Sequence, residues 1–143
     1  MIEPVWVAIA AVLVLIVYLS VRLWMQEPET PPPRIVRAPF HGDVARSQLA
    51  QYDGRDSTKP ILVGIDGELF DVTNSPAYCP GGSYQIFAGT DATRALALSS
   101  FETFDLAHPT KRDDFTQDHT ESLQQWVSFF RGKYRVVGKI LDR

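Results

Sequence analysis

The chain is poor in the residues on which many small proteins rely, with one cysteine and three histidines among 143 residues. The lone Cys79 cannot form an intrachain disulfide, which excludes a disulfide-stabilised secreted domain. Basic runs interleaved with aromatic residues are missing too, and the net charge is −3 at pH 7. A nucleic-acid partner therefore has no support, because such a partner requires a basic surface.

Catalytic patterns are equally scarce. No Ser/His/Asp, Cys/His or paired-carboxylate arrangement can be assembled from the spacing, so we expect a protein that is not an enzyme. Internal repeats are absent from the sequence. A length of 143 residues predicts one globular domain once the non-globular segments are set apart.

One long apolar run lies near the N-terminus. Val5–Leu23 is polar only at Ser20 and Arg22, and it is long enough to cross the hydrocarbon core of a bilayer. A cleaved signal peptide fits poorly, since no basic residue precedes the run and no small-x-small cleavage site follows it. We predict a single transmembrane helix as an N-terminal anchor in residues 1–25.

The charges around this run predict its orientation. Glu3 precedes it, whereas Arg22, Arg34 and Arg37 follow it, which places the C-terminal part of a single-pass protein in the cytosol. Residues 26–36 are rich in proline and predict a semi-rigid linker. The remaining residues, 37–143, predict the globular domain.

The clearest local signal in the globular part is a β-hairpin. Ile61–Ile65 and Glu68–Val72 are apolar runs joined by Asp-Gly, which favours a tight turn between two strands. The hairpin leads to Tyr78–Tyr84, which reads Tyr-Cys-Pro-Gly-Gly-Ser-Tyr. Glycine lets such a turn approach a ligand closely, and its two phenols can face one pocket. A tyrosine oxygen is also able to ligate haem iron.

The other patterns predict short helices and a closing strand, so the fold class is α+β with helices over a sheet. We expect helical stretches from Asp43 to Tyr52, over 83–88 and over 92–98 with Asp91 as its N-cap, a loop over 105–120, a helix capped by Asp118 or Thr120, and a strand over 135–141. Helical spacing makes one apolar face of the last helix a core face, with Leu123, Trp126, Val127 and Phe130. The three histidines, His41, His108 and His119, fall in loop-like sequence and should be exposed.

Several stretches together carry a family resemblance. They are residues 65–73, the pattern Tyr78-x-Pro-x-Gly-x-Tyr84, residues 87–97, and Trp126, Lys133-Tyr134 and Val137-Gly138. On these residues the chain resembles the membrane-associated progesterone receptor (MAPR) family, a branch of the cytochrome b5-like haem/steroid-binding domains. The resemblance implies a cytochrome b5-like fold from about Phe40 onward, behind an N-terminal anchor.

The resemblance also implies a haem b site. In it Tyr84 is the axial ligand of the iron, Tyr78 hydrogen-bonds beside the iron, and Lys133 and Tyr134 contact the haem periphery. An anionic phenolate favours ferric iron and a low reduction potential. Cys79 departs from the family, where glycine is usual. It is either a small residue tolerated in the turn or a thiolate that competes for iron.

A second departure is Ser83, because proline often precedes the ligand tyrosine in this family. A looser turn and a lower haem affinity are the expected consequences.

The function implied is a membrane-anchored haem-binding protein that regulates or supports membrane cytochromes P450 in sterol metabolism, at the endoplasmic reticulum. A haem-mediated homodimer and a sterol ligand are compatible with it. One alternative is a sterol receptor without essential haem, since a flat pocket lined by phenols also suits a steroid. The other is a cytochrome b5-like electron carrier, but the two histidines that such carriers use are missing at Cys79 and in residues 99–104.

Overall fold

The computed structural model describes residues 4–24 and 39–142. The chain divides between Pro33 and Arg34 into two compact units. The first unit contains the helix α1, Pro4–Trp24, whose described side chains from Val7 to Arg22 are all exposed. Among the described residues, no helix has both the length and the apolar character that a membrane span requires. The linker predicted over residues 26–36 lies outside the described residues.

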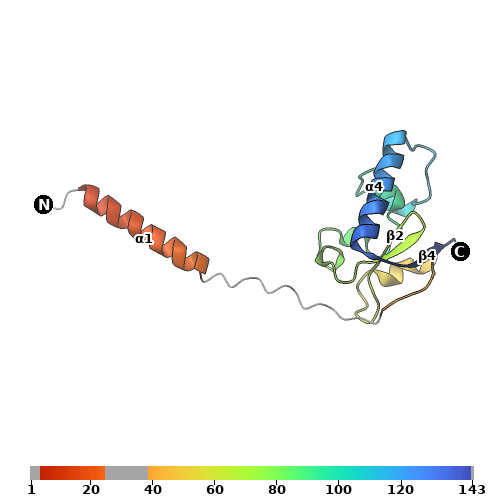
Figure 1. Cartoon of the computed structure of the whole chain (residues 1–143), viewed down its shortest axis with the longest axis horizontal. Coiled ribbons are helices and arrows are strands. Elements are labelled where there is room, and N and C mark those ends of the chain that lie inside the picture. The colour runs from red at the N-terminus through yellow and green to blue at the C-terminus, as the bar shows by residue number, and fades with distance from the viewer. Residues whose placement is uncertain (1–3, 25–38, 143) are drawn as a thin grey trace. The chain divides into compact units, whose positions relative to one another are not determined.

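The second unit is built on a four-stranded sheet with the order β1-β4-β3-β2. Figure 1 labels two of these strands, β2 and β4. Its strands are β1 Val44–Ala45, β2 Leu62–Ile65, β3 Glu68–Asp71 and β4 Arg135–Leu141. β1 runs parallel to β4, whereas the β4-β3 and β3-β2 pairs are antiparallel. The predicted closing strand over 135–141 is therefore confirmed, and it lies at the centre of the sheet.

The predicted hairpin is confirmed. In β2 and β3, Ile65 pairs with Glu68 across a turn formed by Asp66 and Gly67. Both turn residues have positive φ, 50° and 83°, as a two-residue turn that matches the twist of the strands requires. All four residues of β2 are buried, so this strand forms part of the core.

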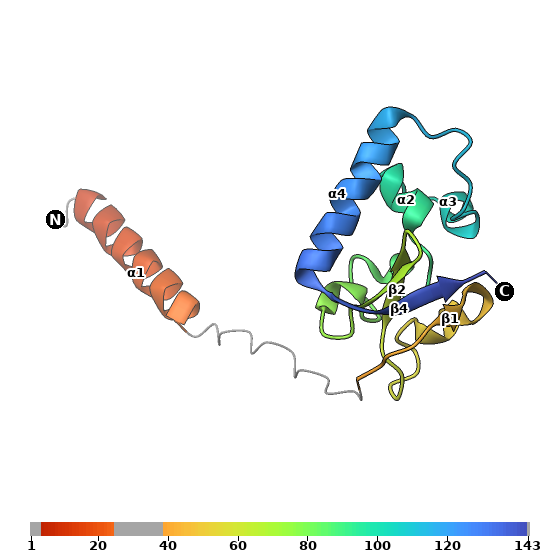
Figure 2. The same ribbon diagram turned by 45° about the vertical axis from the view of Figure 1, so that its right-hand side comes forward.

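Short helical elements connect the strands and a longer helix covers the sheet. They are the 3-10 helices η1 Arg46–Tyr52, η2 Pro76–Tyr78 and η3 Gln85–Phe87, and the α-helices α2 Thr93–Ala97, α3 Thr103–Ala107 and α4 Gln117–Lys133. Figure 2 shows α2 alongside α4, with α3 next to α2. The larger core cluster joins α4 to the sheet, where Phe130 packs edge-on against Phe70 at 5.4 Å between ring centroids. Leu123 and Val127 are buried as predicted, and Trp126 is half-buried.

The predicted helical stretch that ends at Tyr52 is confirmed as a 3-10 helix, but its predicted start near Asp43 was wrong. β1 occupies 44–45, and the 3-10 helix η1 begins only at Arg46. Asp43 does not cap a helix. Its carboxylate accepts a hydrogen bond from the backbone N–H of Lys139 in β4 at 2.9 Å. The pairing of β1 with β4 competes with local helix formation here, and residues 96 positions apart supply the bond.

The prediction of a loop over 105–120 was also wrong at both ends. α3 extends to Ala107, and α4 begins at Gln117 with Thr116 as its N-cap. Thr116 Oγ1 accepts from the backbone N–H of His119 at 3.3 Å, while His119 Nδ1 accepts from the backbone N–H of Thr116 at 3.2 Å. This is a capping box with histidine in the place where glutamate is usual. His119 is therefore a half-buried helix residue, whereas His41 and His108 are exposed as expected.

A buried arginine explains why α3 forms. Arg94 in α2 is 4% exposed, and its Nε donates to Asp105 in α3 at 2.7 Å. Its two terminal nitrogens donate to both oxygens of Asp114 at 2.6 and 2.7 Å, and one also reaches the carbonyl of Lys111 at 2.9 Å. A buried guanidinium must be paired in this way, so α3 and the segment before α4 are held to α2.

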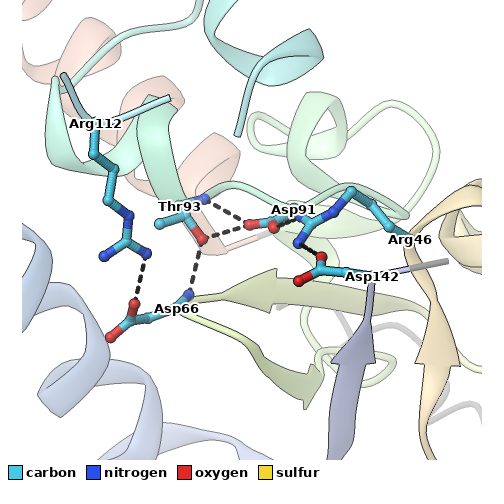
Figure 3. A network of polar contacts seen from close by, with 6 residues as sticks. All are labelled: Arg46, Asp66, Asp91, Thr93, Arg112 and Asp142. Atoms are coloured by element: carbon cyan, nitrogen blue, oxygen red, sulfur yellow. Dashed lines mark hydrogen bonds and ion pairs between the residues drawn. The ribbon is translucent and has the colours of Figure 1, made fainter. Parts of the chain in front are cut away.

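A second polar network holds the start of α2 to the hairpin and to the end of β4 (Figure 3). Asp91 is buried, and its carboxylate accepts from the backbone N–H of Thr93 at 3.1 Å, from the Thr93 hydroxyl and from Arg46. The Thr93 hydroxyl in turn accepts from the backbone N–H of Asp66 at 2.8 Å. Ala92 is the N-cap residue by its position, but Asp91 supplies the acceptor for the first turn of α2.

We expect Gly82→Ala to destabilise the domain. A Cβ at Gly82 would lie less than 3.0 Å from the carbonyl oxygens of Pro76 and Ala77, which are backbone atoms and cannot rotate away. Overpacking of this kind lowers the free energy of unfolding by about 1–3 kcal/mol. Urea unfolding measures the change. The control is Gly132→Ala, where nothing lies within 4 Å and a helical glycine is replaced. It should be neutral or stabilising, and an equal loss in both variants would contradict the prediction.

We expect the stability of the domain to fall as the pH drops from about 4 to about 2. Hydrogen bonds from Arg94 lower the pKa of Asp114 to about 2. Because the folded pKa lies below the unfolded value, the stabilisation is complete above pH 4 and is lost as Asp114 becomes protonated in the folded state. Urea unfolding of the wild type and Asp114→Asn at pH 7 and pH 3 measures this loss. The variant should be less stable at pH 7 and less sensitive to acid, whereas parallel curves would refute the assignment.

Candidate functional site

The Tyr78–Tyr84 turn brings its two end residues together. It follows η2, and the backbone N–H of Gly82 donates to the carbonyl of Cys79 at 2.8 Å. The backbone N–H of Tyr84 then donates to the carbonyl of Ala77, also at 2.8 Å, which closes the turn. Gly81 has φ +86°, a conformation that glycine adopts without strain. The rings of Tyr78 and Tyr84 consequently lie 5.9 Å apart between centroids.

The two tyrosines have unequal environments. Tyr78 is 6% exposed, whereas Tyr84 is 42% exposed. Burial raises the pKa of the Tyr78 phenol above its ordinary value, and Tyr134 and Tyr84 raise it further. Tyr78 therefore stays neutral at physiological pH and keeps its proton to donate. Tyr84 presents its phenol at the surface.

The end of α4 supplies the other two predicted site residues. Tyr134 is the C-cap residue of α4, and its ring packs edge-on against Tyr78 with 6.0 Å between centroids. Its hydroxyl donates a long hydrogen bond to Ser75 Oγ at 3.4 Å. The Lys133 ammonium lies 5.5 Å from the centre of the Tyr134 ring. The structure thus places all four predicted residues in one continuous group, while their roles toward a ligand stay predictions.

Sequence analysis missed a further aromatic residue in this group. Phe101 lies nearly parallel to Tyr84, with 10° between the ring planes and 6.5 Å between centroids, and it is 58% exposed. The buried Phe87 contacts both rings, at 5.4 Å from Phe101 and 6.2 Å from Tyr84. The only signal for Phe101 in the sequence is a lone aromatic residue among polar ones, between Ser100 and Glu102.

Cys79 packs against the core at the start of the turn. Its Sγ lies 3.6 Å from the carbonyl oxygen of Ser75 and 4.0 Å from that of Thr73. These contacts are those of a thiol that donates weak hydrogen bonds to the backbone. The geometry therefore favours the structural interpretation of Cys79 over the hypothesis of a competing iron ligand.

A hollow of about 360 Å³ adjoins the turn and is lined by Asp53, Arg55, Gln85, Ile86 and Ala88. Neither Tyr78 nor Tyr84 lines it. The candidate site is therefore the exposed aromatic surface of Tyr84 and Phe101, with Tyr78, Phe87 and Tyr134 behind it, and we call these five residues the aromatic cluster.

Comparisons with known proteins identify the family of the chain. Residues 45–120 match the family described as "Cytochrome b5-like Heme/Steroid binding domain". The chain is 43% identical over 115 residues to "Membrane steroid-binding protein 1" of Oryza sativa subsp. japonica, covering 80% of this chain and 46% of that protein. It is 38% identical over 123 residues to human "Membrane-associated progesterone receptor component 2", covering 81% of this chain and 51% of that protein.

A solved structure extends the agreement to the fold. A hypothetical protein from Arabidopsis thaliana, described as having a cytochrome b5 like fold, superposes with a TM-score of 0.63 at 39% sequence identity, covering 70% of this chain and 91% of that chain. The chain spans about half the length of the first curated relatives that it matches. The family match and these identities show that the chain belongs to the cytochrome b5-like heme/steroid-binding domains, and among them to the membrane-associated progesterone receptor family.

Proposed function

We propose that this chain is a membrane-attached haem-binding protein in which Tyr84 is the ligand of the haem iron. The observation that carries the proposal is the unequal pair of phenols, with Tyr84 at 42% exposure beside Tyr78 at 6%. A side chain that ligates the iron must be accessible to the haem. A neighbour that donates a hydrogen bond to that side chain must keep its own proton. Tyr84 and Tyr78 meet these two requirements separately.

The residues present fit a haem group. Tyr84 offers an oxygen donor of a kind known to ligate haem iron. Tyr78, kept neutral by burial, can donate a hydrogen bond to a charged phenolate oxygen. Lys133 is exposed at the edge of the aromatic cluster, where its ammonium can pair with a propionate. When bound, haem b would supply a ferric centre of low reduction potential, because an anionic oxygen ligand favours Fe(III).

The electron-carrier alternative loses support in the structure. A cytochrome b5-like carrier would need two histidine ligands, but His108 and His119 take part in local structure. His108 Nδ1 lies 2.9 Å from the carbonyl of Phe104, and His119 closes the capping box of α4. We therefore propose a non-enzymatic binding role in place of electron transfer.

A steroid-binding role is the second candidate. The printed description of the family covers both ligands, and relatives are named steroid-binding proteins. The exposed rings of Tyr84 and Phe101 suit a steroid nucleus as well as a porphyrin. A protein that takes up no haemin but binds a sterol saturably would favour this candidate.

Membrane attachment is proposed through α1. Its described side chains are apolar and exposed from Val7 to Leu19, and relatives are named membrane proteins. We further propose, on the family resemblance, that the domain faces the cytosol at the endoplasmic reticulum and supports membrane cytochromes P450. Confinement to one membrane raises the effective concentration of such partners.

We expect Tyr84→Phe to abolish the ferric absorption spectrum that haemin acquires with the wild-type protein, because the variant lacks the ligand oxygen. Tyr78→Phe should keep binding but shift the reduction potential downward, since the phenolate oxygen loses a hydrogen bond, becomes a stronger anionic donor and favours Fe(III) more. Absorption and EPR spectroscopy with potentiometry measure both changes. The control is Tyr52→Phe, a tyrosine that packs against Phe40 away from the aromatic cluster. An unchanged spectrum in Tyr84→Phe would sink the ligand assignment.

We expect two arginines in α1 to abolish membrane attachment. Leu13→Arg with Val17→Arg places two charges in the middle of the helix, and each disfavours insertion by about 2.5–3.5 kcal/mol. Flotation with liposomes after a carbonate wash measures the attachment of the full chain. Phe129→Arg, at an apolar residue of the domain that is 49% exposed, is the matched control and should float like the wild type. Flotation of the double variant would refute the role of α1.

A further inference from the structure

Phe101 is more exposed than Tyr78 and Phe87, the two other aromatic residues whose rings contact Tyr84. It is 58% exposed, and its ring is parallel to the Tyr84 ring within 10°. The centroid separation of 6.5 Å is smaller than the breadth of a porphyrin macrocycle. A macrocycle at the Tyr84 oxygen is therefore large enough to reach Phe101 as well.

Phe87 provides the base beneath these two rings. It is 4% exposed and lies within 6.2 Å of Tyr84 and 5.4 Å of Phe101. Tyr84 and Phe87 come from η3 and its N-cap, and Phe101 comes from the segment before α3, so two separate stretches of chain form one aromatic surface. A flat π-system binds well to such a surface, because ring faces and edges attract one another in offset or tilted arrangements.

The segment that carries Phe101 is held in place independently of any ligand. Ser99 turns the chain with φ +50°, and the backbone N–H of Ser100 donates to the carbonyl of Ala95 at 2.8 Å. A few residues later, Asp105 accepts from the buried Arg94. A hydrogen bond from the Ser100 side chain lowers the pKa of Asp105, and the hydrogen bond from Arg94 lowers it further. Asp105 therefore stays charged and keeps its ion pair with Arg94. A surface that is ordered before binding loses less conformational entropy when the ligand arrives.

We propose that Phe101 is the iron-independent contact of the site, holding the ring system of a tetrapyrrole at Tyr84 whether or not the ring carries a metal. This proposal rests on the proposed function for the position of the site at Tyr84. It adds a contact that contributes to binding without the bond between iron and the Tyr84 oxygen. It also assigns a preference: a flat aromatic macrocycle can place a ring face on Phe101, whereas a sterol offers only a puckered aliphatic skeleton.

Binding of protoporphyrin IX, which has no iron, tests the proposal on the full chain in detergent micelles. Titrations are followed by porphyrin fluorescence at one detergent concentration, so that partition into micelles is common to every variant. Phe101→Ala should weaken the affinity for protoporphyrin IX by about 3–10-fold, the range for one aromatic contact. Phe101→Leu keeps the apolar volume, so it should fall between the alanine variant and the wild type.

Phe104→Ala is the matched control. Phe104 is also a phenylalanine of this segment and is 51% exposed, but it faces His108, Lys111 and Arg94 rather than Tyr84. Phe104→Ala should change the affinity for protoporphyrin IX by less than 2-fold. This limit corresponds to about 0.4 kcal/mol, because a tenfold change in affinity is about 1.4 kcal/mol. Equal affinities of Phe101→Ala and Phe104→Ala for protoporphyrin IX would overturn the proposal, as would a wild type that binds no protoporphyrin IX.

Tyr84→Phe separates this proposal from the proposed function. It should weaken haemin binding while leaving protoporphyrin IX binding within 2-fold of the wild type, because the ring remains and only the oxygen is lost. If haemin spectra do not respond to Tyr84→Phe, the ligand assignment fails and the Phe101 contact stands on the protoporphyrin IX result. If Phe101→Ala binds protoporphyrin IX like the wild type, the Phe101 contact fails and the ligand assignment is unaffected. Far-UV circular dichroism of each variant checks that the fold is retained.

Discussion

The close approach of two backbone segments at Gly82 is the constraint on which the candidate site depends. Residue 82 lies against the carbonyl oxygens of Pro76 and Ala77, where no Cβ fits, and the hydrogen bond from Tyr84 to Ala77 closes the turn. Because the turn closes, Tyr84 lies beside Tyr78 and not at the far end of a loop. The proximity of the two phenols, and hence any shared action on a ligand, follows from this backbone contact.

The buried Arg94 organises the other side of the site. Its guanidinium pairs with Asp105 and Asp114 at once, so α3 and the segment before α4 are fixed to α2. A buried charge tolerates no loss of its partners, which makes this arrangement specific as well as stable. Phe101 lies in the short stretch between α2 and α3, and its position next to Tyr84 depends on these ion pairs. The polar network behind the site and the aromatic surface in front of it are therefore linked.

The aromatic cluster has a buried part and an exposed part. Tyr78, Phe87 and Tyr134 lie inside or partly inside the core, where burial keeps the Tyr78 phenol protonated. Tyr84 and Phe101 face outward and can contact a ligand. An open aromatic surface of this kind leaves the far face of a flat ligand accessible. That accessibility is compatible with the binding role that we propose, and it differs from a site that buries its cofactor between two ligands for electron transfer.

The hairpin, the closing strand, the core face of α4 and the family could be predicted from the sequence alone, because each depends on local periodicity, turn residues or a specific motif. Tyr78 and Tyr84 were likewise visible, since the Pro-Gly-Gly turn between them is a local signal. The other features follow from tertiary contacts. α3 forms because Arg94 reaches Asp105 from another element, β1 replaces a helical start because β4 pairs with it, and Phe101 meets Tyr84 across 17 residues of chain. These features depend on contacts between residues that are distant in the sequence. A local sequence pattern does not show which distant residue the fold will bring into contact.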